Sequence, residues 1–160
     1  METLYFDVLQ FLYHLALALV VGGAIVLGSA VAPGVFTAAR TRGEGGLLFG
    51  AILARYDQLA IFAIVVLAVT SLLKFFAFED TDFGWRLAAR WIALALLALS
   101  VLYGGAWSNP VARTLRAQTR DFDELPENSA PRIEFAKLHR ASTRAMRVAI
   151  LSGLAALFLS

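Results

Sequence analysis

The sequence predicts an all-α integral membrane protein, a single four-helix transmembrane bundle over residues 1–160. Two observations predict this class. The 160 residues are 59% hydrophobic and only 16% charged, whereas soluble domains are nearer half apolar and a quarter charged. The apolar residues also gather in four segments that reach the roughly 20 residues of a spanning helix when charged side chains at their ends extend to the headgroups. We expect helices at about 6–32, 46–76, 84–107 and 133–159.

The first two expected helices differ in how clearly they reach spanning length. The first contains one ionisable residue, His14, in the apolar run 8–31, and meets that length alone. The tripeptide Ala-Pro-Gly at 32–34 predicts its end. In the second, an amphipathic stretch at 45–58 precedes the uncharged run 59–73, so the helix reaches spanning length only if charged residues lie at its ends.

The last two expected helices are separated by the one long polar connection, 108–132. The uncharged run 91–107 forms the third helix, and Asn109-Pro110 predicts its end. The helical pattern of the fourth begins near Ile133, just after Pro131.

The distribution of Lys and Arg predicts the orientation. The loops after the first and third helices, with the start of the fourth, carry ten cations, against three on the other side, where an acidic turn holds Glu79, Asp80 and Asp82. Cytoplasmic loops are rich in Lys and Arg. We therefore expect a bacterial inner membrane protein with both termini outside.

Small residues recur four apart on the first two expected helices, which lets helix backbones approach closely in a bilayer. We expect this to serve packing within the bundle, and a homodimer remains the alternative. The residues are Ala24, Gly28 and Ala32, and Gly46, Gly50 and Ala54.

The start of the fourth expected helix has two faces. Four cations fall within about a quarter-turn and suit anionic lipid headgroups, at about 1 kcal/mol each. His139 and Ser142 fall on the opposite side and face the bundle. The net charge of +2 is too small to indicate nucleic acid. The four cations are Lys137, Arg140, Arg144 and Arg147.

A polar cluster is expected at the inner end of the bundle. Arg55 and Asp57 begin the second helix at about the depth of His139 and Arg140 on the fourth. A buried carboxylate needs a partner, so we expect Asp57 to contact Arg140 or His139. Whether the cluster binds a ligand or only completes hydrogen bonds stays open.

A second polar group is expected at the outer end. Asp7, Gln10 and His14 share one face of the first helix, and Arg86 and Arg90 share one face of the third at the same level. These side chains converge in an outward pocket, or Asp7 pairs with an arginine and His14 bonds to a neighbouring helix.

Several chemistries have no support. There is no cysteine, and no short-spaced ligand cluster suits a metal, so we expect no catalytic group, metal ion or cofactor. Haem would need both His14 and His139, which should lie on the order of 20 Å apart along the membrane normal. Haem is therefore disfavoured unless a dimer supplies one histidine from each chain.

Three stretches carry a resemblance: GGAIVLGSAVAPGVF at 22–36, LLFGAILARYDQL at 47–59 and FAKLHRAS at 135–142. Together they resemble a bacterial membrane family of unknown function related to eukaryotic transmembrane protein 205. The resemblance implies a four-helix membrane protein and no particular reaction. It points to cytoplasmic-end positions, namely Pro33, Phe36, Tyr56, Phe135, His139 and Ser142.

The main functional hypothesis is a non-enzymatic bundle that binds a small molecule, a lipid or a partner at a polar cytoplasmic mouth. The alternative is a small dimeric transporter or channel, and a haem or redox protein comes third. The candidate ligand-binding residues are Arg55, Tyr56, Asp57, His139, Arg140, Ser142, His14, Arg86 and Arg90.

Overall fold

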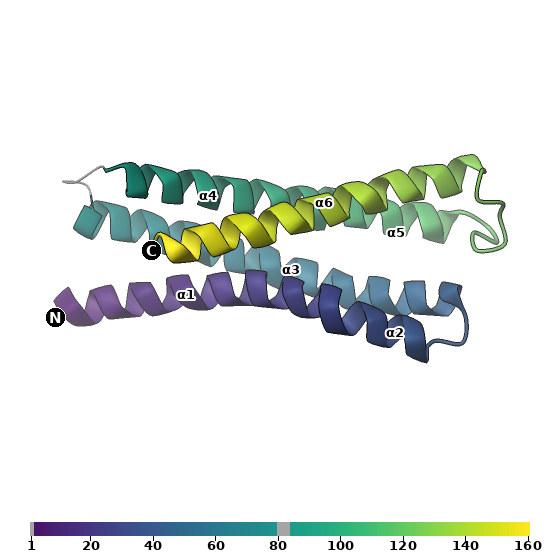
Figure 1. Ribbon diagram of the computed structural model, residues 1–160, viewed down its shortest axis with the longest axis horizontal. Coiled ribbons are helices and arrows are strands. Elements are labelled where there is room, and N and C mark those ends of the chain that lie inside the picture. The colour runs from purple at the N-terminus through teal and green to yellow at the C-terminus, as the bar shows by residue number, and fades with distance from the viewer. Residues whose placement is uncertain (1, 80–83) are drawn as a thin grey trace.

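The computed structural model describes residues 2–79 and 84–160 as a bundle of four long helical segments (Figure 1). Within this part of the chain there is no strand, and four helices are long and apolar enough to cross a membrane: Thr3–Ala38, Arg42–Phe78, Trp85–Gln118 and Ala130–Phe158. The predicted fold class is confirmed. The elements are α1 Glu2–Val26, π-helical η1 Leu27–Val31, α2 Ala32–Ala38, α3 Arg42–Lys74, π-helical η2 Phe75–Glu79, α4 Trp85–Val101, π-helical η3 Leu102–Ser108, α5 Asn109–Gln118 and α6 Ala130–Phe158.

Both termini lie at one end of the bundle, which we call the termini end (Figure 1). The connections 39–41 and 119–129 lie at the other, which we call the loop end. Asp80 and Asp82 of the expected acidic turn are outside the described residues, so that expectation stays a prediction.

The two prolines that were expected to end the first and third helices do not end them, and this corrects both predicted boundaries. Each follows a π-helical turn, after which the helix continues for several residues. At these turns the Ala32 N–H donates to Leu27 O, and the Asn109 N–H to Gly104 O. Proline lacks an N–H and clashes with the carbonyl four residues back. Bonds to the fifth residue back open the turn at these points, and the chain stays helical.

The second and fourth helices begin earlier than expected, the second at a capped start and the fourth with a proline in its first turn. Thr41 Oγ1 accepts a hydrogen bond from Glu44 N at 3.1 Å, and Glu44 Oε2 accepts one from Arg40 N at 2.9 Å. This reciprocal arrangement satisfies two donors at the start of α3. Pro131 sits in the first turn of α6, where its missing N–H costs nothing.

The core is apolar and runs along the bundle axis. Its fully buried side chains include Tyr13, Leu17, Val20 and Leu97. Many large apolar side chains on the outside are exposed, as lipid-facing surfaces require.

The small residues at four-residue spacing do not all pack between helices. Ala24 is buried, but a side chain added at Gly28 or Gly50 would meet nothing within 4 Å. A close approach between helices occurs at Gly153 of α6, where an added Cβ would overlap Val21 Cγ2 of α1. Intrabundle packing therefore explains only part of the predicted pattern.

Candidate functional site

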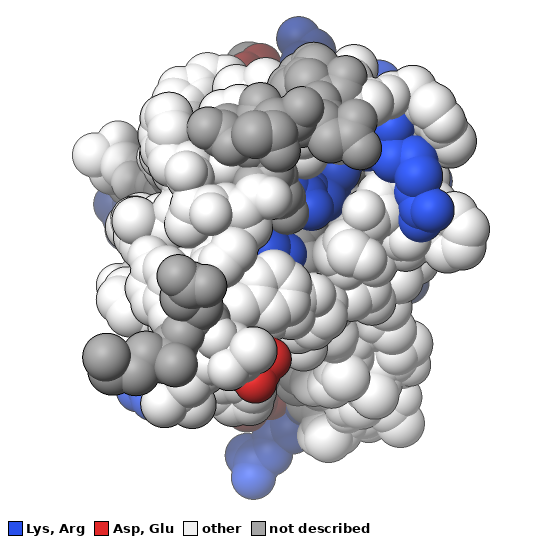
Figure 2. Space-filling view, turned by 90° about the vertical axis from the view of Figure 1, so that its left-hand side faces the viewer, with Lys and Arg blue, Asp and Glu red and all other residues white. Residues whose placement is uncertain are grey.

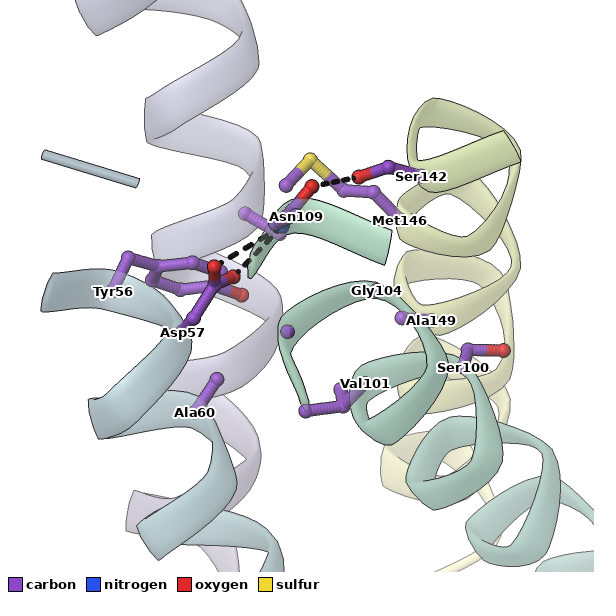
Figure 3. Close-up of a pocket in the computed structure, with 12 residues that line it drawn as sticks. Tyr56, Asp57, Ala60, Ser100, Val101, Gly104, Asn109, Ser142, Met146 and Ala149 are labelled. Atoms are coloured by element: carbon purple, nitrogen blue, oxygen red, sulfur yellow. Dashed lines mark hydrogen bonds between the residues drawn. The ribbon is translucent and has the colours of Figure 1, made fainter. Parts of the chain in front are cut away.

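A buried hydrogen-bond network links three helices near the loop end (Figure 3). Asp57 on α3 accepts hydrogen bonds from Asn109 Nδ2 to both carboxylate oxygens, each at 3.1 Å. Arg113 Nη1 donates to Asp57 Oδ2 at 3.2 Å. Ser142 Oγ on α6 donates to Asn109 Oδ1 at 2.5 Å. We call these four residues the Asp57 network.

The local backbone positions this network. Gly105 in η3 lets that segment approach Asp57, since an added Cβ would lie 3.3 Å from the Asp57 Cβ. Ser108 Oγ donates to Leu138 O at 3.0 Å and ties η3 to α6. Because the helix continues past Pro110, Asn109 and Arg113 lie one turn apart on the same face and both reach Asp57.

A small cavity of about 30 Å³ adjoins the network. Its polar lining includes Tyr56, Asp57, Asn109 and Ser142, with Met146 and several small residues (Figure 3). Tyr56 Oη donates to Val20 O at 2.7 Å, which fixes its ring beside α1. The volume and the polar groups suit one or two water molecules.

A much larger cavity of about 730 Å³ opens at the loop end. We call it the mouth cavity. It lies between α2 and α3 on one side and α5, α6 and the 119–129 connection on the other. Asn109 borders both cavities, so the Asp57 network separates them. The lining residues are Phe36, Arg42, Gly46, Leu47, Phe49, Gly50, Ala51, Leu53, Asn109, Ala112, Arg113, Arg116, Ala117, Thr119, Phe122, Asp123, Arg132, Phe135, Ala136 and His139.

One wall of the mouth cavity is cationic and ordered. Arg116 Nη2 donates to Gly43 O at 2.9 Å and to Asp123 at 2.7–2.8 Å. The guanidinium groups of Arg116 and Arg132 lie 5.6 and 5.4 Å from the Phe122 ring centroid. Such cation–π contacts hold arginines over an aromatic face. Contacts within the protein therefore fix the positions of the arginine side chains in this wall.

The expected partners of Asp57 were wrong. We expected Arg140 or His139, but Arg113 and Asn109 donate the hydrogen bonds to the carboxylate. Arg140 is exposed, and its Nε donates to Ala136 O at 3.2 Å. The structural reason is the continuation of the third helix, which brings two residues assigned to a loop onto the carboxylate.

The other inner candidates divide into three locations. Tyr56 and Ser142 lie at the small cavity with Asp57. His139 is exposed, lines the mouth cavity and stacks on Phe135 with ring centroids 6.3 Å apart. Arg55 is exposed and lines neither cavity.

The outer candidates come together only in part. His14 Nε2 lies 3.1 Å from both Gln10 Nε2 and Ser160 Oγ. Lys74, which the sequence did not single out, is 2% exposed, donates from Nζ to Gln10 Oε1 and lies 4.9 Å from the Tyr13 ring centroid.

The three remaining outer residues differ in burial. Arg90 is buried near the start of α4, whereas Arg86 and Asp7 are exposed. Figure 2 shows Lys and Arg side chains recessed among uncharged residues on this end face. Of the outer group, Lys74 contacts Gln10, which lies beside His14, and Arg90 is a second buried cation.

The two histidines lie far apart. His14 is beside Ser160 at the termini end, and His139 lines the mouth cavity. Ser160 follows His139 by 21 positions, about 30 Å along a helix. One protomer therefore cannot place both histidines on one haem. Among the described residues, no group of three or more His, Asp or Glu side chains could hold a metal ion.

Asn109, Arg113, Arg116 and Arg132 are site residues that the sequence analysis did not select. A signal was available: Asn109, Arg113 and Arg116 are spaced four and three apart, which is one face of a helix. This spacing was not used because a residue that precedes proline, such as Asn109, usually lies at the end of a helix.

Comparison with known proteins places the chain in a family. No curated protein and no solved structure matches it. Residues 15–121, more than half of the chain, match the family described as a domain of unknown function, DUF4149. The matched region includes Asp57, Asn109 and Arg113 but ends before Ser142 and His139. The four-helix membrane protein with this buried carboxylate and arginine-lined cavity belongs to the DUF4149 family.

Proposed function

We propose that the protein is a non-enzymatic, ligand-binding membrane protein whose binding site is the mouth cavity. The observation that carries this proposal is the cavity itself, about 730 Å³ with a mixed apolar and cationic lining. Small-molecule sites in proteins typically occupy about 300–1,000 Å³, with mostly apolar walls and a few placed polar groups.

The Asp57 network supports this function by giving the cavity a firm polar floor. Asn109 is fixed by Asp57 on one side and Ser142 on the other. Arg113 bonds to Asp57 while 35% of its side chain stays exposed, so it can also contact a ligand. A floor with preset side-chain positions lowers the cost of ordering groups on binding.

A small dimeric transporter is the second candidate. The polar small cavity beyond the network favours it, because a path through the bundle would need such a station. Against it, the core between this cavity and His14 contains Leu17, Val20 and Leu97, all buried. A conducting path would have to open this apolar region, so we favour binding.

Location and ancestry form part of the same proposal. We place the loop end in the cytoplasm and both termini outside a bacterial inner membrane, because ten cations lie toward the loop end. On α6, anionic headgroups of the surrounding lipid would contact Lys137, Arg140, Arg144 and Arg147.

A relationship to eukaryotic transmembrane protein 205 is proposed on the three sequence stretches quoted above.

The test uses a matched pair of glycine substitutions. Gly50→Leu would project into the mouth cavity, and Gly22→Leu would add the same side chain on α1, outside both cavities; neither added Cβ meets an atom within 4 Å. Both replace a mid-helix glycine, which favours the helix by about 1 kcal/mol. Native mass spectrometry of protein purified in mild detergent would measure retained non-protein mass.

We expect the parent and Gly22→Leu to retain a discrete bound mass and Gly50→Leu to lose it while folding normally. Equal retention by all three proteins, or a bare chain in each case, would contradict a site in the mouth cavity.

A further inference from the structure

We propose that the ligand of the mouth cavity is an anionic phospholipid, with its headgroup phosphate on the arginine wall and an acyl chain against α3. This inference rests on the proposed function and specifies the class of its ligand. It concerns a bound lipid inside the cavity, which differs from the surrounding lipid that contacts the outside of α6.

The charge of the lining favours an anion. Four arginines line the mouth cavity and only one carboxylate, Asp123, faces them. Asp57, which borders the small cavity, is already bonded by Asn109 and Arg113. The four arginines are Arg42, Arg113, Arg116 and Arg132. Such an excess of one sign in a cleft attracts the opposite charge.

These arginines have donors to spare. A guanidinium carries five N–H donors in a planar fork that matches phosphate oxygens. Among the described residues, Arg113 uses one donor, on Asp57. Arg116 directs Nη2 to Gly43 and Asp123, and Arg132 lies 4.0 Å from Asp123. Fixed guanidinium groups with unused donors are what a phosphate needs.

The opposite wall of the cavity suits a hydrocarbon chain. Gly50 and Leu53 of α3 line it, and a side chain added at Gly50 would meet only open space. Leu47 and Phe36 are 63% and 47% exposed at its edge, so the apolar wall continues into the lipid-facing surface. An acyl chain can therefore enter from the bilayer without crossing a polar barrier.

The placement along the membrane normal agrees with a lipid. The wall from Gly46 to Leu53 spans about 10 Å of helix axis at the loop end of a spanning helix. Arginines at such an end reach the headgroup layer. A free phosphate ion would use the arginines but would gain nothing from the apolar wall, and a neutral amphiphile would gain nothing from the arginines.

The experiment compares lipids on the full-length, delipidated protein in neutral detergent. Palmitoyl-oleoyl phosphatidylglycerol, phosphatidylcholine with the same chains and inorganic phosphate would each be titrated, with native mass spectrometry reading the first binding event. We expect a single phosphatidylglycerol to bind at least tenfold more tightly than phosphatidylcholine, and phosphate not to displace it at equal concentration.

Two charge variants locate the site. Arg132→Gln removes a cation from the cavity, and Arg144→Gln removes an exposed cation from the same helix outside it. Removal of one cation near a headgroup should weaken binding about fivefold. At the first, tight binding event we expect this loss for Arg132→Gln and no change for Arg144→Gln, whose headgroup contacts are with the surrounding lipid, and we expect Gly50→Leu to lose the tight site.

The outcomes separate this inference from the function on which it rests. Equal affinity for both lipids, still abolished by Gly50→Leu, would keep the site and overturn its anionic character. Displacement of lipid by phosphate would overturn the lipid as ligand. Equal effects of Arg132→Gln and Arg144→Gln would place the anion outside the cavity. If Gly50→Leu bound every ligand as tightly as the parent does, the proposed function itself would be overturned.

Discussion

The Asp57–Arg113 pair offers the sharpest test of the energetics of this bundle. In Arg113→Gln, the Asp57 carboxylate keeps its two bonds from Asn109 but loses its only cationic partner among the described residues. Because the Asp57 side chain is 7% exposed, water cannot replace that partner fully. The substitution should therefore lower the free energy of unfolding.

The structure sets the size of this loss. Removing one partner of a fully buried ion pair costs about 3–5 kcal/mol, and a hydrogen bond to a charged group contributes about 1.5–3 kcal/mol. The Arg113 side chain is 35% exposed and the carboxylate retains Asn109. We therefore expect the lower range, a loss of about 2 kcal/mol.

A second substitution tests the cause. Asp57→Asn removes the buried charge with little change in shape. It loses one hydrogen bond from Asn109, which should lower the free energy of unfolding by about 1 kcal/mol. Once the charge is gone, Arg113→Gln should cost almost nothing more. The double variant should be more stable than Arg113→Gln alone, with a coupling of about 1–2 kcal/mol.

The assay is reversible unfolding in mixed detergent micelles, followed by the fluorescence of the three tryptophans. Parent, single variants and double variant form one cycle. Strictly additive effects, within about 0.5 kcal/mol, would refute the view that Arg113 stabilises the fold by compensating Asp57.

Two further predictions concern packing and hydrogen bonding. Gly153→Ala should lower the free energy of unfolding by about 1–3 kcal/mol, because its methyl group would overlap Val21. Gly28→Ala, where the space is open, should be neutral or slightly stabilising in the same assay, and equal effects would count against close packing at Gly153. Ser142→Ala should cost about 1–2 kcal/mol, because Asn109 Oδ1 loses its donor inside the bundle; an unchanged midpoint of unfolding would show that this bond does not stabilise the fold.

The number of helices and their approximate positions could be predicted because the bilayer imposes a simple rule on length and polarity. His14 alone interrupts the apolar run of the first helix, and the runs at 59–73 and 91–107 contain no charge. The burial of Asp57, expected from its place at the inner start of the second helix, is also found in the structure. These inferences depend on local patterns, which a single sequence contains.

The partners of Asp57 could not be predicted in the same way. Proline ends many helices, so Asn109 and Arg113 were assigned to a connection. Whether a helix stops at proline or continues through a wider turn depends on tertiary contacts, here the bond from Ser108 to Leu138 O and the approach of Gly105 to Asp57. The pairing therefore depends on contacts between residues far apart in sequence.

The mouth cavity was anticipated only as a polar region. Its arginine wall combines Arg116 from α5 with Arg132 from α6, and both lie over Phe122 in the intervening connection. Helical periodicity cannot predict that an aromatic residue in a loop will contact two arginines from different helices. His139, a candidate chosen from the sequence, lines this cavity, whereas the arginines that line it were not chosen.

The π-helical turn before Pro110 also fixes the rotational phase of everything that follows it in the third helix. An added residue in one turn rotates the rest of a helix by about 100° relative to an unbroken α-helix. Deleting a single residue from Leu102–Ser108 would turn α5 by that angle and carry Asn109 and Arg113 off the face that meets Asp57. Within this family, a one-residue gap in this segment would therefore mark a protein with a different pocket floor, even if every side chain named here were retained.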